Sequence, residues 1–130
     1  MDQSTNKLAA QKKLLELFPD FLELRSFNAG KVAVKAMDII RIEANKSYSV
    51  FYLKDNRKFI SSHNLSYQEK KINSNYFFRT GKSFLINLFH VISVSGSAPV
   101  KLIMTDGYEI VISRRKTAHF IAMYKLFQFK

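Results

Sequence analysis

Two polar, cationic segments in the second half of the chain stand next to short apolar runs. Residues 79–83, with one Arg and one Lys, lie between the apolar residues 77–78 and 84–86. Residues 113–116, with two Arg and one Lys, directly follow an apolar run at 110–112. Such runs are typical of strands, so the cations should stand at strand ends. Cations held at the edge of a rigid sheet can bind phosphate oxygens and reach base edges in a groove.

Charge is distributed unevenly along the chain. The formal net charge is +11, yet residues 1–30 carry four Lys and Arg against four Asp and Glu. Residues 31–130 therefore hold the whole excess, with 17 Lys and Arg against 6 Asp and Glu. A basic body favours a polyanionic partner, either nucleic acid or an acidic membrane surface. The alternative is a domain whose basicity only keeps it soluble and monomeric.

Length and composition favour one soluble domain. The chain has 130 residues, of which 47% are apolar and 12 are Phe, so a sizeable core can form. It has no Cys, which excludes disulfides, thiolate metal sites and thiol nucleophiles. No apolar run approaches the roughly 20 residues that span a bilayer, and the N-terminus does not resemble a secretory signal. We expect a cytoplasmic protein.

The first 29 residues read as a helical extension. Leu8, Leu15 and Phe18 share one side of a helix predicted over residues 5–25, and the break at residues 28–30 separates it from the basic body at 30–130. This extension either packs on the domain or serves as an arm for dimerisation or for a partner.

The rest of the chain alternates between strand and turn patterns. Strands are predicted at residues 32–35, 40–43, 48–53, 58–60, 76–79, 83–86, 91–94, 100–104 and 108–112. Tight turns are predicted at Asp55-Asn56 and Asp106-Gly107. A short helix is predicted over residues 65–72, with a capping box from Ser66 to Glu69. A closing helix over residues 117–127 should bury Phe120, Ile121, Tyr124 and Phe127.

These elements predict a mainly β domain of the α+β class. It would hold small antiparallel sheets, one short internal helix and a helix at each end. No two adjacent helices are spaced as a helix-turn-helix, and zinc fingers need Cys, so any reading of DNA must use loops and strand ends.

Three segments in this order resemble the LytTR family of bacterial transcription-factor DNA-binding domains. They are Phe-Phe-Arg-x-x-Lys-Ser-Phe-Leu-Ile-Asn at 77–87, His-Val-Ile-Ser-Val at 90–94 and Asp-Gly-x-x-Ile-x-Ile-Ser-Arg-Arg-Lys at 106–116. The resemblance covers residues 32–126. It implies an elongated arrangement of small β-sheets that presents three loops along one face of duplex DNA.

The resemblance also implies which residues contact DNA. They are Lys46, Ser47 and Tyr48 in the first loop, Gly81, Lys82 and Ser83 in the second, and Arg114, Arg115 and Lys116 in the third. Arg115 matches the position that reads a base edge, a role that suits its planar fork. Arg79 either bridges to phosphate or holds the sheet through hydrogen bonds. Each loop has a simpler interpretation as a solvated turn. In the third loop, however, three cations at the start of a helix oppose the helix dipole, which favours a bound anion there.

One position departs from the family pattern. Many members have His where Gly81 stands, so we expect the second loop to grip phosphate more weakly or differently. The operator sequence therefore cannot be taken from relatives.

Enzyme chemistry finds no support in the sequence. His63, His90 and His119 are scattered and the acids of the basic body are spread singly, so neither a metal site nor a nuclease centre is expected. With four Gly in all, the chain has no glycine-rich loop for nucleotide phosphates. We expect no enzyme activity, no metal and no cofactor.

The family resemblance implies a regulator in a two-component or related system. A receiver domain usually precedes this module, and 30 residues are too few for one, so we expect an excised effector half or a stand-alone regulator controlled by a partner protein. Double-stranded DNA, in direct repeats that pair two copies on the duplex, is the expected partner. The alternative function is a basic interaction module that binds an acidic protein or lipid headgroups.

Overall fold

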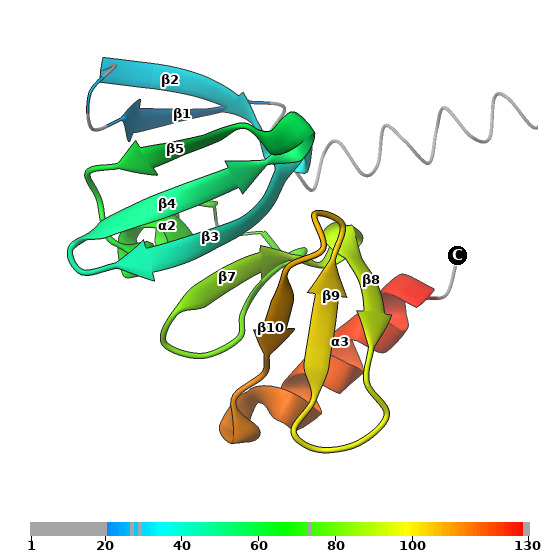
Figure 1. Ribbon diagram of the computed structural model, residues 1–130. Helices are drawn as coiled ribbons and strands as arrows, with labels where there is room; N and C mark the ends of the chain where they lie inside the picture. Colours follow the sequence, from blue (N-terminus) through cyan, green and yellow to red (C-terminus); the bar gives the residue numbers. More distant parts are fainter. Residues whose placement is uncertain (1–20, 27, 29, 73, 129–130) are drawn as a thin grey trace, which may run out of the picture.

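The computed structural model describes residues 21–26, 28, 30–72 and 74–128 (Figure 1). The helix predicted before residue 21 lies outside this part of the chain. The described strands form two antiparallel sheets, one of seven strands and one of three. The mainly β class predicted from the sequence is confirmed.

The seven-stranded sheet has the order β2-β1-β5-β4-β3-β7-β6. Its strands are β1 (Phe21–Ser26), β2 (Gly30–Lys35), β3 (Ile39–Asn45), β4 (Tyr48–Leu53), β5 (Lys58–Ser61), β6 (Phe77–Arg79) and β7 (Phe84–Asn87). Short 3-10 helices η1 (Ala36–Asp38) and η2 (Lys54–Asn56) precede β3 and β5. Asp55 and Asn56 have positive φ, as the predicted tight turn requires.

The predicted helix over residues 5–25 is wrong at its end, because Phe21–Ser26 is strand β1. Leu22 and Leu24 are buried while Phe21 and Glu23 are exposed, which is the alternation of a half-buried strand. All six residues of β1 pair with β2. This tertiary pairing decides the structure of a short apolar run whose local pattern also fits a helix.

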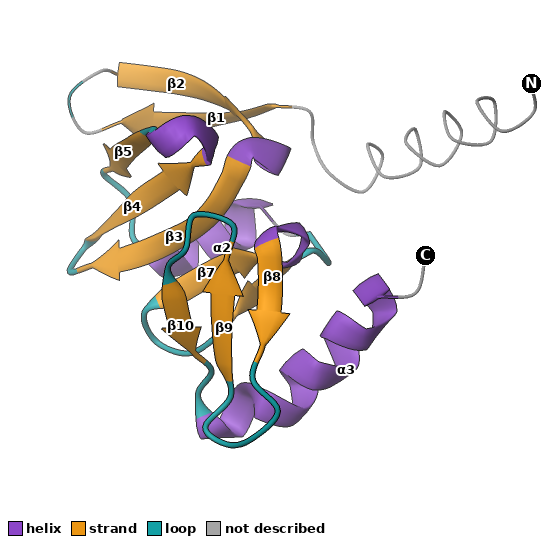
Figure 2. Ribbon diagram, turned by 45° about the vertical axis from the view of Figure 1, so that its right-hand side comes forward, coloured by secondary structure: helices purple, strands orange, loops and turns teal. Residues whose placement is uncertain are grey.

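The three-stranded sheet has the order β10-β9-β8 and is covered by a helix (Figure 2). Its strands are β8 (Val91–Val94), β9 (Lys101–Met104) and β10 (Glu109–Val111). Helix α3 (Thr117–Gln128) buries Phe120 against its inner face, together with Leu102 and Ile110. Ile121 was also predicted to be buried, but it is 39% exposed because it lies on the outer side of α3.

Strand β7 connects two hydrophobic cores. Leu85 belongs to the core beneath helix α2 (Leu65–Ile72), on one face of the seven-stranded sheet. Ile86, which points to the opposite face, belongs to the core shared with the three-stranded sheet and α3. The alternation of side chains along one short strand therefore fixes the two sheets to each other.

Side-chain caps set the ends of two short elements. Asn64 accepts a hydrogen bond from the Tyr67 amide at 2.8 Å, so it caps α2 in place of the predicted box from Ser66 to Glu69. Asn87 accepts from the Phe89 amide at 2.9 Å and donates to the Ile39 carbonyl at 3.1 Å. Asn87 thus fixes the turn after β7, where η3 (Leu88–His90) begins.

Candidate nucleic-acid interface

The first loop is a two-residue turn between β3 and β4. Lys46 has a left-handed backbone with φ 57°, and Asn45 pairs with Tyr48 across the turn. Lys46, Ser47 and Tyr48 are all exposed. The hairpin thus carries a cation, a hydroxyl and a phenol at its tip.

The second loop joins β6 to β7 and is held from inside by Arg79. The guanidinium of Arg79 donates to the carbonyl of Gly81 at 2.8 Å and to that of Lys82 at 3.0 Å. Its third nitrogen pairs with the Glu69 carboxylate of α2 at 2.8 Å. These bonds occupy three of the five guanidinium N–H groups and leave Lys82 and Ser83 exposed.

The third loop leads from β10 into α3. Arg114, Arg115 and Lys116 form the 3-10 helix η4 ahead of the first turn of α3. Arg114 and Arg115 are exposed, whereas Lys116 is partly covered, with its ammonium 5.9 Å from the ring centroid of Phe78. Thr117 donates to the Ser113 carbonyl at 3.0 Å and closes this turn.

Backbone hydrogen bonds join the three loops. The amide of Ser113 donates to the Thr80 carbonyl at 2.9 Å, and the amide of Ala44 donates to the Ser83 carbonyl at 2.8 Å. A side chain at Gly81 would contact the Ser113 Cβ at 3.4 Å, so the second and third loops are close neighbours. The β3–β4 turn, the β6–β7 loop and η4 follow one another along one flank, at the left in Figures 1 and 2.

This flank is positively charged and its cations have no acidic partners within the described residues. The cations are Lys46, Lys82, Arg114, Arg115 and Lys116, and none of them takes part in an ion pair there. Some basic residues elsewhere do have an acidic partner, since Lys54 and Arg57 both pair with Asp38. A row of uncompensated cations at a sheet edge suits a polyanion.

The family of LytTr DNA-binding domains matches residues 30–125. The chain belongs to this family. Among solved structures it is similar to the LytTr DNA-binding domain of a putative methyl-accepting/DNA response regulator from Bacillus cereus, at 17% identity and a TM-score of 0.67. That match covers 80% of this chain and 95% of the other, and it supports the fold. A search of the curated proteins finds no match.

Family membership gives the LytTr domain its general role, which is DNA binding in transcription regulation. LytTr domains are a DNA-binding family and not an enzyme family. In the described part of the chain no three His, Asp or Glu side chains form a group that could hold a metal ion. None of the helices in that part is long and apolar enough to cross a membrane.

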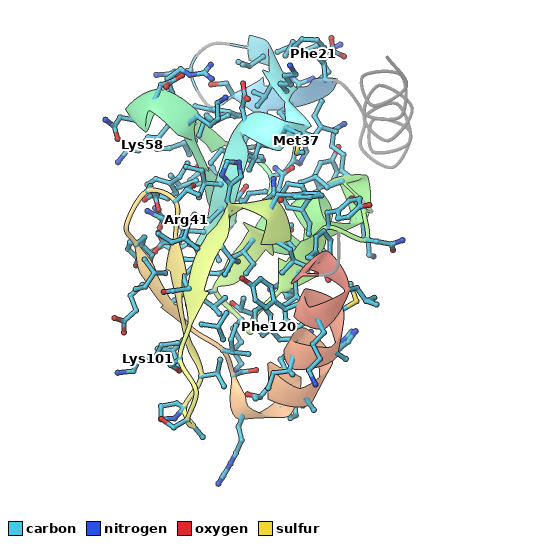
Figure 3. The ribbon with its side chains drawn as sticks, turned by 90° about the vertical axis from the view of Figure 1, so that its right-hand side faces the viewer. Phe21, Met37, Arg41, Lys58, Lys101 and Phe120 are labelled. Atoms are coloured by element: carbon cyan, nitrogen blue, oxygen red, sulfur yellow. The ribbon has the colours of Figure 1, made fainter. Side chains whose placement is uncertain are left out.

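The sequence analysis missed one residue that shapes this LytTr interface. Arg41 on β3 is only 5% exposed, and it lies where the two sheets meet (Figure 3). Its guanidinium carbon is 3.7 Å from the ring centroids of both Tyr52 and Tyr108, and its Nε is 3.2 Å from the Asp106 carboxylate. The available signal was a lone charge between Ile40 and Ile42 in an apolar strand, which demands a buried partner.

Proposed function

We propose that this LytTr domain binds duplex DNA sequence-specifically through its three loops and acts as a bacterial transcriptional regulator. The observation that carries the proposal is the pair of backbone bonds from Ser113 to Thr80 and from Ala44 to Ser83. Through them, three polar loops from distant parts of the chain hold fixed positions on one cationic flank. A rigid row of contacts can match the repeating geometry of a duplex.

The loops carry different roles in this proposal. Arg115 reads a base edge, because an exposed guanidinium can donate to O6 and N7 of guanine together. Lys82, Arg114 and Lys116 bind phosphates, and Ser83 adds a hydroxyl donor. Lys46, Ser47 and Tyr48 enter the groove at the other end of the row. Gly81 contributes its backbone, and Arg79 positions the loop through its bonds to the Gly81 and Lys82 carbonyls.

Regulation and assembly follow from the same proposal. The protein works in the cytoplasm, either as the effector part of a two-component response regulator or as a small regulator controlled by a protein partner. Two copies bind direct repeats about one helical turn apart, so that both lie on the same side of the duplex. Adjacent binding raises specificity without a large protein–protein interface.

Selection of bound duplexes from a random pool tests the proposal. The expected result is an enriched motif, preferred over scrambled duplex of equal length, with the preference reduced in Arg115→Ala. Equal affinity for scrambled duplex, heparin and anionic vesicles would contradict it and favour a basic interaction module. A genomic footprint of the protein would then identify the operator and the regulated genes.

A further inference from the structure

The cationic flank continues beyond the three loops to the end of the β1–β2 hairpin. Arg25 on β1 and Lys31 on β2 are directly opposite each other and both exposed. Like charges at facing positions of an antiparallel pair destabilise it. Neither residue forms an ion pair within the described part of the chain. A bound anion would remove this repulsion.

A cavity of about 260 Å³ lies at this end of the hairpin. Three cations, Arg25, Lys31 and Lys71 of α2, line it together with one acid, Glu23. The formal charge of the cavity wall is therefore positive. The rings of His63 and Tyr67 also form part of the wall, stacked at 3.9 Å between centroids. Three cations against one carboxylate suit an anionic group such as phosphate.

A buried polar network fixes the cavity relative to the first loop. Ser49, which follows Tyr48 on β4, donates to the His63 carbonyl at 2.8 Å. The side-chain amide of Gln68 donates hydrogen bonds to the hydroxyls of Ser49 at 3.2 Å and Ser61 at 2.9 Å. Ser49, Ser61 and Gln68 are fully buried, so the junction between β5 and α2 cannot shift independently of β4.

The distance between this cavity and the first loop fits the dimensions of DNA. In the order β2-β1-β5-β4-β3, three strand spacings separate the middle of the β1–β2 hairpin from the middle of the β3–β4 hairpin. At about 4.8 Å each this gives roughly 14 Å, which exceeds half of the major-groove width of about 12 Å, so the β1–β2 hairpin lies past the edge of a groove that the first loop enters. The left ends of β1 and β2 lie on the same flank as the β3–β4 turn in Figures 1 and 2. A duplex whose groove receives Lys46 therefore brings a phosphate strand to Arg25 and Lys31.

We infer that Arg25, Lys31 and Lys71 form a fourth DNA contact, to backbone phosphates flanking the groove that the first loop enters. The inference rests on the proposed function and extends it to a second segment of the duplex. Arg25 lies outside residues 30–125, the part that matches the family, so this contact depends on a strand that the family match does not include.

The test compares two lysines of one strand. Lys31→Ala removes a cation at the cavity, whereas Lys35→Ala removes another exposed cation, at the opposite end of β2. For Lys31→Ala the slope of log affinity against log salt should shrink by roughly 0.9, and by about twice that when Arg25→Ala is added. Lys35→Ala should keep the wild-type slope. Lys31→Gln, which retains the stem of the side chain, should reproduce Lys31→Ala.

Shortening the duplex locates the contact. Removing base pairs beyond the first loop should weaken binding by the wild type much more than binding by the Arg25→Ala/Lys31→Ala double variant, since the double variant has already lost two of the three cations of the flanking contact. Equal salt slopes for Lys31→Ala and Lys35→Ala would overturn the inference. So would calorimetric binding of inorganic phosphate that needs Lys31 while the DNA slope stays unchanged, because the cavity would then serve a free anion.

The two proposals fail in different ways. If the wild type prefers its selected duplex and Arg115→Ala loses that preference, the proposed function stands whatever Lys31→Ala does. If the wild type shows no preference for any duplex, the proposed function falls, and the fourth contact falls with it.

Discussion

The guanidinium carbon of Arg41 lies 3.7 Å from the ring centroid of Tyr108, so a cation of the seven-stranded sheet is packed on an aromatic ring of the β9–β10 hairpin. Tyr52 stacks on the other side of the guanidinium at the same distance, and the Asp106 carboxylate forms an ion pair with it. Arg41 precedes the first loop on β3, and Tyr108 lies directly before β10, the strand that leads to the third loop. This contact therefore helps to set the separation between the two ends of the interface.

Replacing this cation should cost considerable stability. Arg41→Met keeps an apolar stem but leaves the Asp106 carboxylate without its partner, and we expect the free energy of unfolding to fall by about 2–4 kcal/mol. Arg57→Met is the control, because Arg57 is 57% exposed and pairs with Asp38 at 3.4 Å; its loss should cost less than about 1 kcal/mol. Urea denaturation measures both. Similar decreases in the free energy of unfolding for the two variants would show that Arg41 does not stabilise the contact between the sheets.

DNA binding should weaken steeply with added salt. Each phosphate contact lowers log affinity by roughly 0.9 per log unit of salt, and the flank offers several unpaired cations. Fluorescence anisotropy of a labelled duplex over a salt series gives the slope. An affinity that stays nearly flat from low to physiological salt would argue against a phosphate-binding flank.

Two neighbouring cations of the third loop should behave differently. Arg115→Ala should weaken the free energy of binding to the selected site by about 1–3 kcal/mol and that to scrambled duplex much less, as expected for the loss of a base contact. Lys116→Ala should weaken binding to both duplexes about equally, because a phosphate contact carries no sequence information. If both variants lose the same affinity on both duplexes, Arg115 is not the base-reading residue.

Arg79 should act on DNA through the shape of the second loop. Arg79→Gln removes its bonds to the Gly81 and Lys82 carbonyls, so we expect faster amide hydrogen exchange in the β6–β7 loop and weaker DNA binding. Glu69→Gln is the control, since it breaks only the partly exposed pair with Arg79 and should leave the loop in place. Unchanged hydrogen exchange in Arg79→Gln would contradict this positioning role and favour the alternative, in which Arg79 contacts a phosphate directly.

Assembly can be tested by sedimentation with and without DNA. We expect a monomer in solution that pairs only on direct repeats, because pairing on adjacent sites needs no large protein interface. A shortened version beginning at Phe21 keeps β1 and serves as the comparison. A full-length dimer that becomes monomeric on this shortening would make the first 20 residues the assembly arm.

Most elements from Gly30 onward follow from local patterns in the sequence. Helix α2 spans Leu65–Ile72 as predicted, and α3 extends one residue past the predicted end at 127. Asp106-Gly107 lies in the predicted turn between β9 and β10, and its glycine has φ 84°, a conformation that favours Gly. These features depend on residues close in the chain, which is why the sequence is sufficient for them.

Features that depend on distant residues could not be predicted in this way. Strand β1 owes its conformation to β2, and Arg41 owes its burial to Tyr108, which is far along the chain. The proximity of Ser113 to Gly81 is likewise a product of tertiary packing. For the interface, the sequence indicates which side chains could touch DNA, but only the fold places their loops on one flank.

The position of β1 determines where a stable fragment of this domain can begin. The segment matching the family starts at residue 30, and a polypeptide cut there would lack the strand that pairs with β2. Val34 would lose the cover of Leu22 and Leu24, β2 would lose the one strand with which it pairs, and β5 would become an exposed edge of the sheet. Exposed edges of this kind recruit strands from other molecules. A fragment trimmed to the family boundary should therefore be prone to aggregation, even though every loop of the DNA-binding flank is still present.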